Sequence, residues 1–278
     1  MPEVLPNLIR ITDPADPRIA PYCDVRERDL VGRDGHFIAE GEVVLQTLVQ
    51  SERHQPVSLL LDEKRVEGLG PITAQLAGDV PVYVASQAVL DGIVGFHIHR
   101  GILALGHRAP APSADALLAS VRARRALVVV LMGISNHDNL GGIFRNAAAF
   151  GADAVLLDAQ CCDPFYRKAI RVSVGNTLTL PHARLEPSDD VVTLLERHGF
   201  TAVSLSPNGE FRLAALKRPA RVAALLGTEG PGLDEAVLAR TLTVRIPMAP
   251  GVDSLNVATT SGIVLHQLTE AAGDPEPA

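Results

Sequence analysis

IPMAPGVDSLNVATTSG, residues 246–262, joins a loop rich in proline and glycine to a helix start made of small residues. Ser254 and Asn256 stand just ahead of its Ala/Thr/Ser/Gly run. Turn formers and small residues let a backbone approach a ligand closely, and loops on a rigid scaffold often carry functional residues. The stretch therefore predicts a binding loop that leads directly into a helix.

Outward from this loop, the second half of the chain alternates short apolar runs with helical segments. Parallel strands covered on both faces have such compositions, so we predict an open parallel α/β sheet. The predicted strands are LVVVLM (127–132), AVLLD (154–158), TAVSL (201–205), VAALL (222–226) and LTVRI (242–246). The predicted helices are residues 139–151, 164–173, 190–199, 233–240 and 256–272.

The first hundred residues form a smaller α/β pattern. GEVVLQTLVQ (41–50) and QAVLDGIVG (87–95) have helical periodicity, whereas VSLLLD (57–62) and VPVYVA (80–85) are typical of strands. Between the two halves, residues 105–126 begin with prolines among small residues and end in a short basic helix, which is typical of a linker. We predict an N-terminal domain at 1–108, a linker at 109–126, a C-terminal domain at 127–272 and a disordered tail at 273–278.

The composition favours well-filled cores and limits the partners. Of the 278 residues 47% are hydrophobic and 21% charged, and a formal net charge of −7 argues against a general polyanion binder. Lys64, Lys168 and Lys217 are the only lysines, so nearly all positive charge is arginine, which makes forked contacts with phosphate. A local arginine patch on an acidic protein can therefore still bind RNA. Aromatic residues are only 4% of the chain, so we do not expect stacking to dominate such binding.

Several classes of site are excluded by their missing motifs. The chain has no dinucleotide-binding G-x-G-x-x-G, no P-loop, no G-x-S-x-G elbow and no H-E-x-x-H. Cys23, Cys161 and Cys162 fit neither a metal-ligand spacing nor a disulfide framework. With no signal peptide and no apolar run near ~20 residues, we expect a reduced, cytoplasmic protein. We expect the His97/His99 pair, beside Arg100, to form a surface or RNA-facing patch rather than a metal site.

Three segments together carry a family resemblance. NLGGIFRNAAAFG (139–151), LLGTEGPGL (225–233) and IPMAPGVDSLNVA (246–258) match, in order and spacing, the three motifs of the SpoU (TrmH-like) group of SPOUT RNA methyltransferases. The resemblance implies a C-terminal trefoil knot, a topology that is very rare among folds. The segment FIAEGEVVLQTLVQ (37–50) resembles the N-terminal substrate-binding domain often attached to SpoU enzymes, which is similar in fold to the ribosomal L30e protein.

By this resemblance the chain is expected to transfer a methyl group from S-adenosylmethionine to a ribose 2′-hydroxyl of rRNA or tRNA, as a homodimer. The residues implied as catalytic are Asn139, Arg145, Glu229, Ser254 and Asn256. The residues implied to bind the cofactor are Leu205, Gly227, Glu229, Gly232, Ile246, Met248, Ser254 and Leu255. The alternatives are a non-catalytic RNA- or ribosome-binding factor that retains the fold, and a SPOUT base methyltransferase.

Local structure suggests simpler roles for some of these residues. Asn139 is placed to cap a helix beginning at Leu140, which Gly151 would end, and either Ser254 or Asn256 is placed to cap the last helix. Because a guanidinium stays protonated, we expect Arg145 to act by electrostatics and positioning rather than as a base. The identity of the general base is left open.

Overall fold

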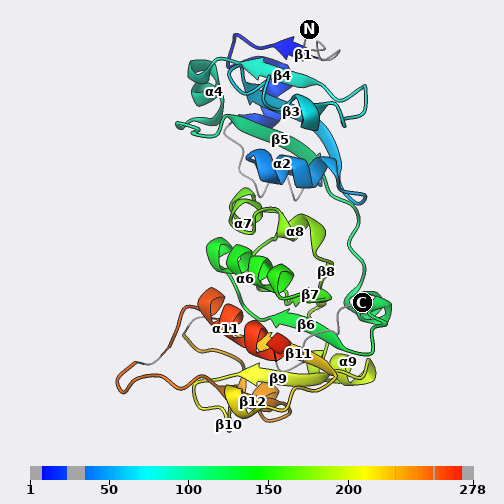
Figure 1. Ribbon diagram of the computed structural model, residues 1–278, viewed down its shortest axis with the longest axis vertical. Helices are drawn as coiled ribbons and strands as arrows, with labels where there is room; N and C mark the ends of the chain where they lie inside the picture. The colour runs from blue at the N-terminus through cyan, green and yellow to red at the C-terminus, as the bar shows by residue number, and fades with distance from the viewer. Residues whose placement is uncertain (1–7, 24–34, 229, 253, 271–278) are drawn as a thin grey trace. The chain divides into compact units, whose positions relative to one another are not determined.

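The computed structural model describes residues 8–23, 35–228, 230–252 and 254–270. The predicted tail at 273–278 lies outside these residues. The chain divides into two units, each with its own sheet (Figure 1). One unit holds residues up to 110 together with 164–179, and the other holds 111–163 and the chain from 180 onward.

The first unit is built on a five-stranded mixed sheet in the order β1-β4-β3-β5-β2. The first three of these strands are parallel, and β5 is antiparallel to both β3 and β2. The strands are β1 (Leu8–Arg10), β2 (His36–Glu40), β3 (Gln55–Asp62), β4 (Val82–Ala85) and β5 (Ile102–His107). The helices are η1 (Pro17–Tyr22), α2 (Glu42–Val49), α3 (Gly70–Thr73), α4 (Gln87–Val94), α7 (Arg167–Val172) and α8 (Asn176–Thr179). The two helices and two strands predicted between residues 41 and 95 are all present.

Both faces of this sheet are buried, because successive side chains of a strand point to opposite faces. On β2, Phe37 joins a core with Leu45 of α2, whereas Ile38 joins the opposite core with Leu90 of α4. Figure 1 shows α2 and α4 as separate helices against the sheet. Tyr22 belongs to the same core as Ile38 and Leu90. Its hydroxyl is paired there, since it lies 2.7 Å from the hydroxyl of Ser58.

Residues 164–179 complete the first of these cores, although they belong to the sequence range predicted as the C-terminal domain. Phe165, Ile170 and Leu178 are buried in it, and the Phe165 ring centroid lies 5.4 Å from that of Phe37. Gly175 allows the close approach to α2, since a Cβ there would lie 3.1 Å from the Thr47 hydroxyl oxygen. The spatial units therefore depart from the predicted sequence ranges at this segment.

The second unit contains a seven-stranded sheet, all of it parallel, in the order β10-β12-β9-β11-β6-β7-β8. The predicted parallel α/β sheet is confirmed, and its five predicted strands are all present. The strands are β6 (Ala126–Leu131), β7 (Ala154–Leu157), β8 (His182–Arg184), β9 (Thr201–Leu205), β10 (Phe211–Arg212), β11 (Arg221–Leu226) and β12 (Leu242–Arg245).

Helices cover both faces of this sheet, with α6 and α11 side by side on one of them (Figure 1). On β6 the alternation is clear: Val128 and Val130 face the core that holds Leu195 of α9. The helices are α5 (Ala114–Ser120), α6 (His137–Ala149), α9 (Val191–Arg197), η2 (Leu213–Ala215), α10 (Glu235–Leu238) and α11 (Val257–Glu270).

The segment predicted as a linker contains a helix, as expected, and this helix packs in the second unit. Leu117 and Leu118 of α5 are buried in the core of the second unit. Beyond the helix, the Arg221 guanidinium donates to the backbone carbonyls of Ala123 at 2.6 Å and Val121 at 3.0 Å. These bonds hold the start of the sheet in place, so only the residues before α5 have the character of a connection.

Candidate active site

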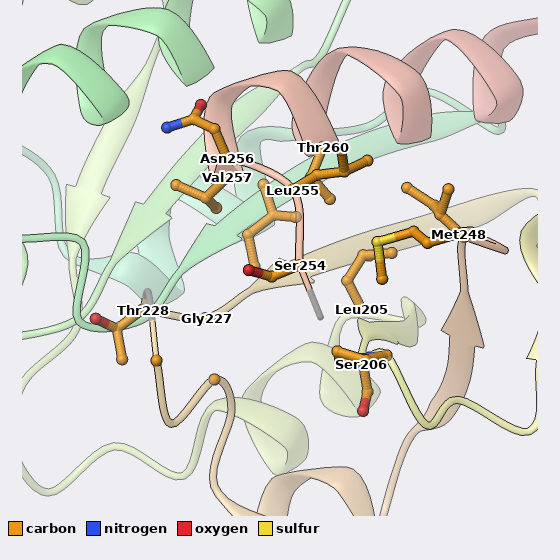
Figure 2. A pocket seen from close by; sticks show the side chains of 15 residues that line it. Leu205, Ser206, Gly227, Thr228, Met248, Ser254, Leu255, Asn256, Val257 and Thr260 are labelled. Atoms are coloured by element: carbon orange, nitrogen blue, oxygen red, sulfur yellow. The ribbon is translucent and has the colours of Figure 1, made fainter. Parts of the chain in front are cut away.

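A pocket of about 380 Å³ opens at the carboxyl ends of β9, β11 and β12, which are neighbours in the sheet. In open α/β sheets, ligands bind outside the carboxyl ends of the strands. Figure 2 shows side chains from these strand ends and from the start of α11 around the pocket. The lining residues are Leu205, Ser206, Pro207, Leu226, Gly227, Thr228, Gly230, Gly232, Ile246, Met248, Ser254, Leu255, Asn256, Val257 and Thr260.

Glycine makes one wall of the pocket possible. A Cβ on Gly227 would lie 2.6 Å from the backbone carbon of Gly232 and from the backbone nitrogen of Leu233. Thr228 and Gly232 also form an isolated antiparallel bridge, which closes the loop on itself. Glu229 lies in this loop but outside the described residues. The two backbones are therefore in contact where the sequence places the second motif.

Asn256 sits where the third motif enters α11. Its side-chain oxygen accepts hydrogen bonds from the backbone N–H groups of Ala258 at 3.0 Å and Thr259 at 3.2 Å, so it is the N-cap of α11. Its side-chain nitrogen donates to Oδ1 of Asn139 at 2.8 Å. Ser254 lines the pocket two residues earlier and is exposed. The prediction that one of these two residues caps the last helix is confirmed, and the cap is Asn256.

Asn139 is not the cap of its helix, contrary to the expectation from the sequence. The helix α6 begins two residues earlier, and Asn136 caps it by accepting from the N–H groups of Asp138 at 2.8 Å and Asn139 at 3.3 Å. Asn139 therefore lies inside the first turn, buried to 8% exposure, where its side chain meets Asn256. The predicted end is correct, since Gly151 follows the helix with a positive φ of 66°.

Arg145 lies on the same helix but is exposed and does not line the pocket. Six residues of α-helix turn its side chain well away from the direction of Asn139. The structure thus brings Asn139, Ser254 and Asn256 together near the pocket and leaves Arg145 on the surface of α6. Seven of the eight residues implied to bind the cofactor line the pocket; the eighth is Glu229.

The comparisons with known proteins agree with this geometry. The SpoU rRNA methylase family profile matches residues 126–266. An uncharacterised tRNA/rRNA methyltransferase of Mycobacterium tuberculosis is 39% identical over 272 residues, which cover 94% of this chain and 91% of the relative. This chain belongs to the SpoU rRNA methylase family. The protein is therefore an RNA methyltransferase.

Solved structures similar to this SpoU chain extend over nearly its whole length. An RNA 2′-O ribose methyltransferase has a TM-score of 0.75 at 29% identity and covers 95% of this chain and 99% of its own. An AdoMet-bound rRNA methyltransferase from Sinorhizobium meliloti has a TM-score of 0.80 at 22% identity, with 95% and 98% covered. The fold of both units is therefore shared with these proteins.

Sequence reasoning missed several polar residues of the SpoU site. Ser206, Thr228 and Thr260 add hydroxyl groups to the pocket lining. Asn146 joins α6 to α11, because its side-chain nitrogen donates to the carbonyl of Ala258 at 2.8 Å and to the hydroxyl of Ser261 at 2.9 Å. Ser206 directly follows a predicted strand, which was an available signal, whereas nothing in the sequence distinguished Asn146 from a surface residue.

Two cysteines of this SpoU chain, Cys161 and Cys162, are unsuited to nucleophilic catalysis. Burial raises the pKa of the Cys161 thiol to about 12, and the nearby Asp158 carboxylate contributes. Burial likewise raises the pKa of Cys162 to about 11. The thiolate is the reactive form of cysteine, so neither residue supplies it near neutral pH.

The histidine pair forms a surface patch. The ring centroids of His97 and His99 are 4.7 Å apart, and Nδ1 of His97 lies 2.8 Å from a carboxylate oxygen of Asp91. Within the described part of the chain, no three His, Cys, Asp or Glu residues group as metal ligands.

No helix among the residues that the structure describes is long and apolar enough to cross a bilayer.

Proposed function

We propose that the protein transfers a methyl group from S-adenosylmethionine to a ribose 2′-hydroxyl of rRNA or tRNA. The observation that carries the proposal is the hydrogen bond between Asn139 and Asn256 beside the pocket. This bond joins the first and third SpoU motifs at the carboxyl ends of the strands, and its two asparagines are 117 residues apart in sequence. The similar RNA 2′-O ribose methyltransferase supports this activity, and the AdoMet-bound rRNA methyltransferase of the same fold supports the cofactor.

The pocket fits S-adenosylmethionine in size and in lining. Its volume of about 380 Å³ lies within the range of small-molecule sites. Leu205, Ile246 and Met248 offer apolar contacts for an adenine ring, while the hydroxyls of Ser206, Thr228 and Thr260 offer hydrogen bonds. Gly227 and Gly232 line the pocket without adding side chains to it. We assign the cofactor to these residues, together with Ser254, Leu255 and Glu229.

When bound, the cofactor supplies a methyl group on a positively charged sulfur, and the protein must present the hydroxyl in line with it. Three hydrogen bonds hold the amide of Asn256 fixed, so Asn139 and Asn256 form a preorganised pair. We assign to this pair, with Ser254 and Glu229, the orientation of the hydroxyl and of the cofactor. The described residues that line the pocket carry hydroxyls and amides but no titratable group.

Arg145 is the residue we assign to the RNA phosphate next to the reacting ribose. Its guanidinium makes bidentate contacts with phosphate and stabilises the negative charge that develops on the hydroxyl oxygen. Because Arg145 is exposed on α6 and does not line the pocket of its own chain, we propose that it serves the pocket of a second copy. The exposed Ile263 of the adjacent α11 is suited to such a homodimer contact through the C-terminal domain.

The domain roles complete this proposal. We propose a trefoil knot at 127–272, with the second and third motifs forming its cofactor loops, and an L30e-like RNA-binding domain at 1–108. We propose that the protein acts on its RNA substrate in the cytoplasm.

The decisive experiment is transfer of labelled methyl from S-adenosylmethionine to unmodified total RNA, followed by nuclease digestion. Label on a ribose 2′-oxygen is the expected result, and separation of tRNA from rRNA identifies the substrate pool. Label on a base would indicate a SPOUT base methyltransferase. Cofactor binding without transfer to any RNA would contradict the proposal in favour of a non-catalytic binding factor.

A further inference from the structure

An arginine–phenylalanine cluster lies on the first unit, outside the candidate active site. Phe96 follows α4 and is 44% exposed. The guanidinium carbon of Arg167 lies 4.9 Å from the centre of its ring, which is the geometry of a cation–π contact. The two residues are brought together because α7 packs in the first unit.

A buried carboxylate organises the arginines of this cluster. Glu40, at the end of β2, is only 6% exposed. One of its oxygens lies 3.5 Å from the guanidinium of Arg167, and the other lies 3.8 Å from that of Arg171. Arg167 is therefore held over the Phe96 ring by a partner that is itself fixed in the sheet, so little side-chain freedom remains to be lost on binding.

Arg100 adds a third positive charge next to this group. Its guanidinium nitrogen lies 2.8 Å from the position a Cβ would occupy on Gly41, so the glycine after Glu40 makes room for it. Among the residues that the structure describes, the three arginines and the Glu40 carboxylate together carry a net charge of +2, on a chain whose formal net charge is −7. The positive charge is thus concentrated beside one of the exposed aromatic rings.

We propose that this cluster binds an unpaired nucleotide of the RNA substrate. The base stacks on the exposed part of the Phe96 ring, and the flanking phosphates contact Arg100 and Arg171. Stacking on aromatic rings and arginine planes is how proteins hold single-stranded bases, whereas bases inside a duplex are already stacked and not accessible. This inference rests on the proposed RNA substrate. Phe96 would supply the stacking contact, and the arginines around it would supply the electrostatic contacts with phosphate.

Binding of a short, unstructured pyrimidine-rich RNA strand to the full-length protein, followed by fluorescence anisotropy, tests the stacking contact. Phe96→Ala is expected to weaken binding by about fivefold or more, since stacking on an aromatic ring contributes about 1–3 kcal/mol per base. The matched control is Phe211→Ala in the second unit, where the residue is 43% exposed, and it is expected to leave affinity unchanged. A duplex of the same length is expected to bind equally to wild type and Phe96→Ala.

Salt dependence of the same binding tests the arginines. Arg100→Gln and Arg171→Gln are each expected to reduce the slope of log affinity against log salt by about 0.7, the value for one phosphate contact on a single strand. Arg10→Gln is the control, because Arg10 is an exposed arginine of the same unit that pairs with Glu63 at 3.2 Å. Unchanged slopes in both test variants would overturn the phosphate contacts.

Cofactor binding and methyl transfer separate this inference from the proposed function. Phe96→Ala is expected to bind S-adenosylmethionine as wild type does, by calorimetry, and to show a raised KM for RNA. If wild type methylates RNA while Phe96→Ala keeps full affinity for the single strand, the cluster has no such role and the proposed function stands. If wild type binds no single-stranded RNA, the cluster proposal is overturned, and the transfer assay decides the function independently.

Discussion

At Gly227 the absence of a side chain is a steric requirement of the pocket. A methyl group there would lie 2.6 Å from two backbone atoms of residues 232 and 233, and neither atom can rotate away. We expect Gly227→Ala to distort the loop and to reduce S-adenosylmethionine affinity at least about tenfold, measured by calorimetry. Gly70→Ala is the control, because nothing lies within 4 Å of its added Cβ. Equal affinity in both variants would show that this loop does not hold the cofactor.

Arg145 is expected to matter for transfer and not for cofactor binding. Its side chain is exposed on α6 and forms no hydrogen bond with the described residues, so its removal leaves the pocket intact. We predict that Arg145→Ala lowers kcat about 10²–10³-fold, as the loss of one charge-stabilising donor does. Arg197→Ala, at an exposed arginine of α9, is the control. Full activity of Arg145→Ala would remove the role that we assign to it.

Among the elements, α11 depends on Asn256 in two separable ways. Asn256 caps the helix with its oxygen and binds Asn139 with its nitrogen. We expect Asn256→Ala to lose about 0.5–2 kcal/mol of stability with the cap. Asn256→Ser keeps a capping oxygen without the amide nitrogen, so denaturant unfolding should show near wild-type stability while methyl transfer stays low. Recovery of transfer in the serine variant would mean that the Asn139 contact is dispensable.

The helix α9 carries a pH-dependent cap. Asp190 accepts from the N–H groups of Val192 and Thr193, and a hydrogen bond from Arg240 lowers its pKa from 3.8 to about 2. Because the pKa is lowered in the folded protein, the stabilisation is present above pH 3.8 and is lost as the pH falls through about 2. The pair is half exposed, so we expect about 1 kcal/mol or less.

Unfolding curves over this acidic range measure the effect of Asp190. The wild type should lose stability relative to Asp190→Asn as the pH falls from 3.8 towards 2, because the amide does not titrate. Parallel stability curves for the two proteins would contradict the lowered pKa of Asp190.

Most helices and strands of the chain were predictable from the sequence, but the start of α6 was not. The apolar runs of β6, β9 and β11 are continuous, so their place in a parallel sheet followed from composition. The predicted cap of α6 was three residues late, because Asn136 and Asn139 are both good capping residues. Only the hydrogen bonds distinguish the asparagine that caps from the one that faces Asn256.

For the whole molecule, the packing of residues 164–179 in the first unit has a direct consequence. Phe165 is buried between Phe37 and His54, with ring centroids 5.4 and 5.2 Å away. Phe165→Ala should therefore cost about 3–5 kcal/mol and increase hydrogen exchange in β2 and β3 of that unit. Phe200→Ala is the matched control, because Phe200 is buried in the core of the second unit. Faster exchange confined to the second unit in Phe165→Ala would contradict this packing.

Apolar periodicity was enough to predict the parallel sheet, and the resemblance of three segments to the SpoU motifs predicted which residues line the pocket. Both predictions rest on residues that lie close together in sequence. The contact between Asn139 and Asn256, the position of Arg145 away from its own pocket and the packing of 164–179 in the first unit required the folded chain. These features depend on residues that are far apart in sequence. Apolar periodicity indicates that one face of an element is buried, but it does not indicate which other element packs against that face.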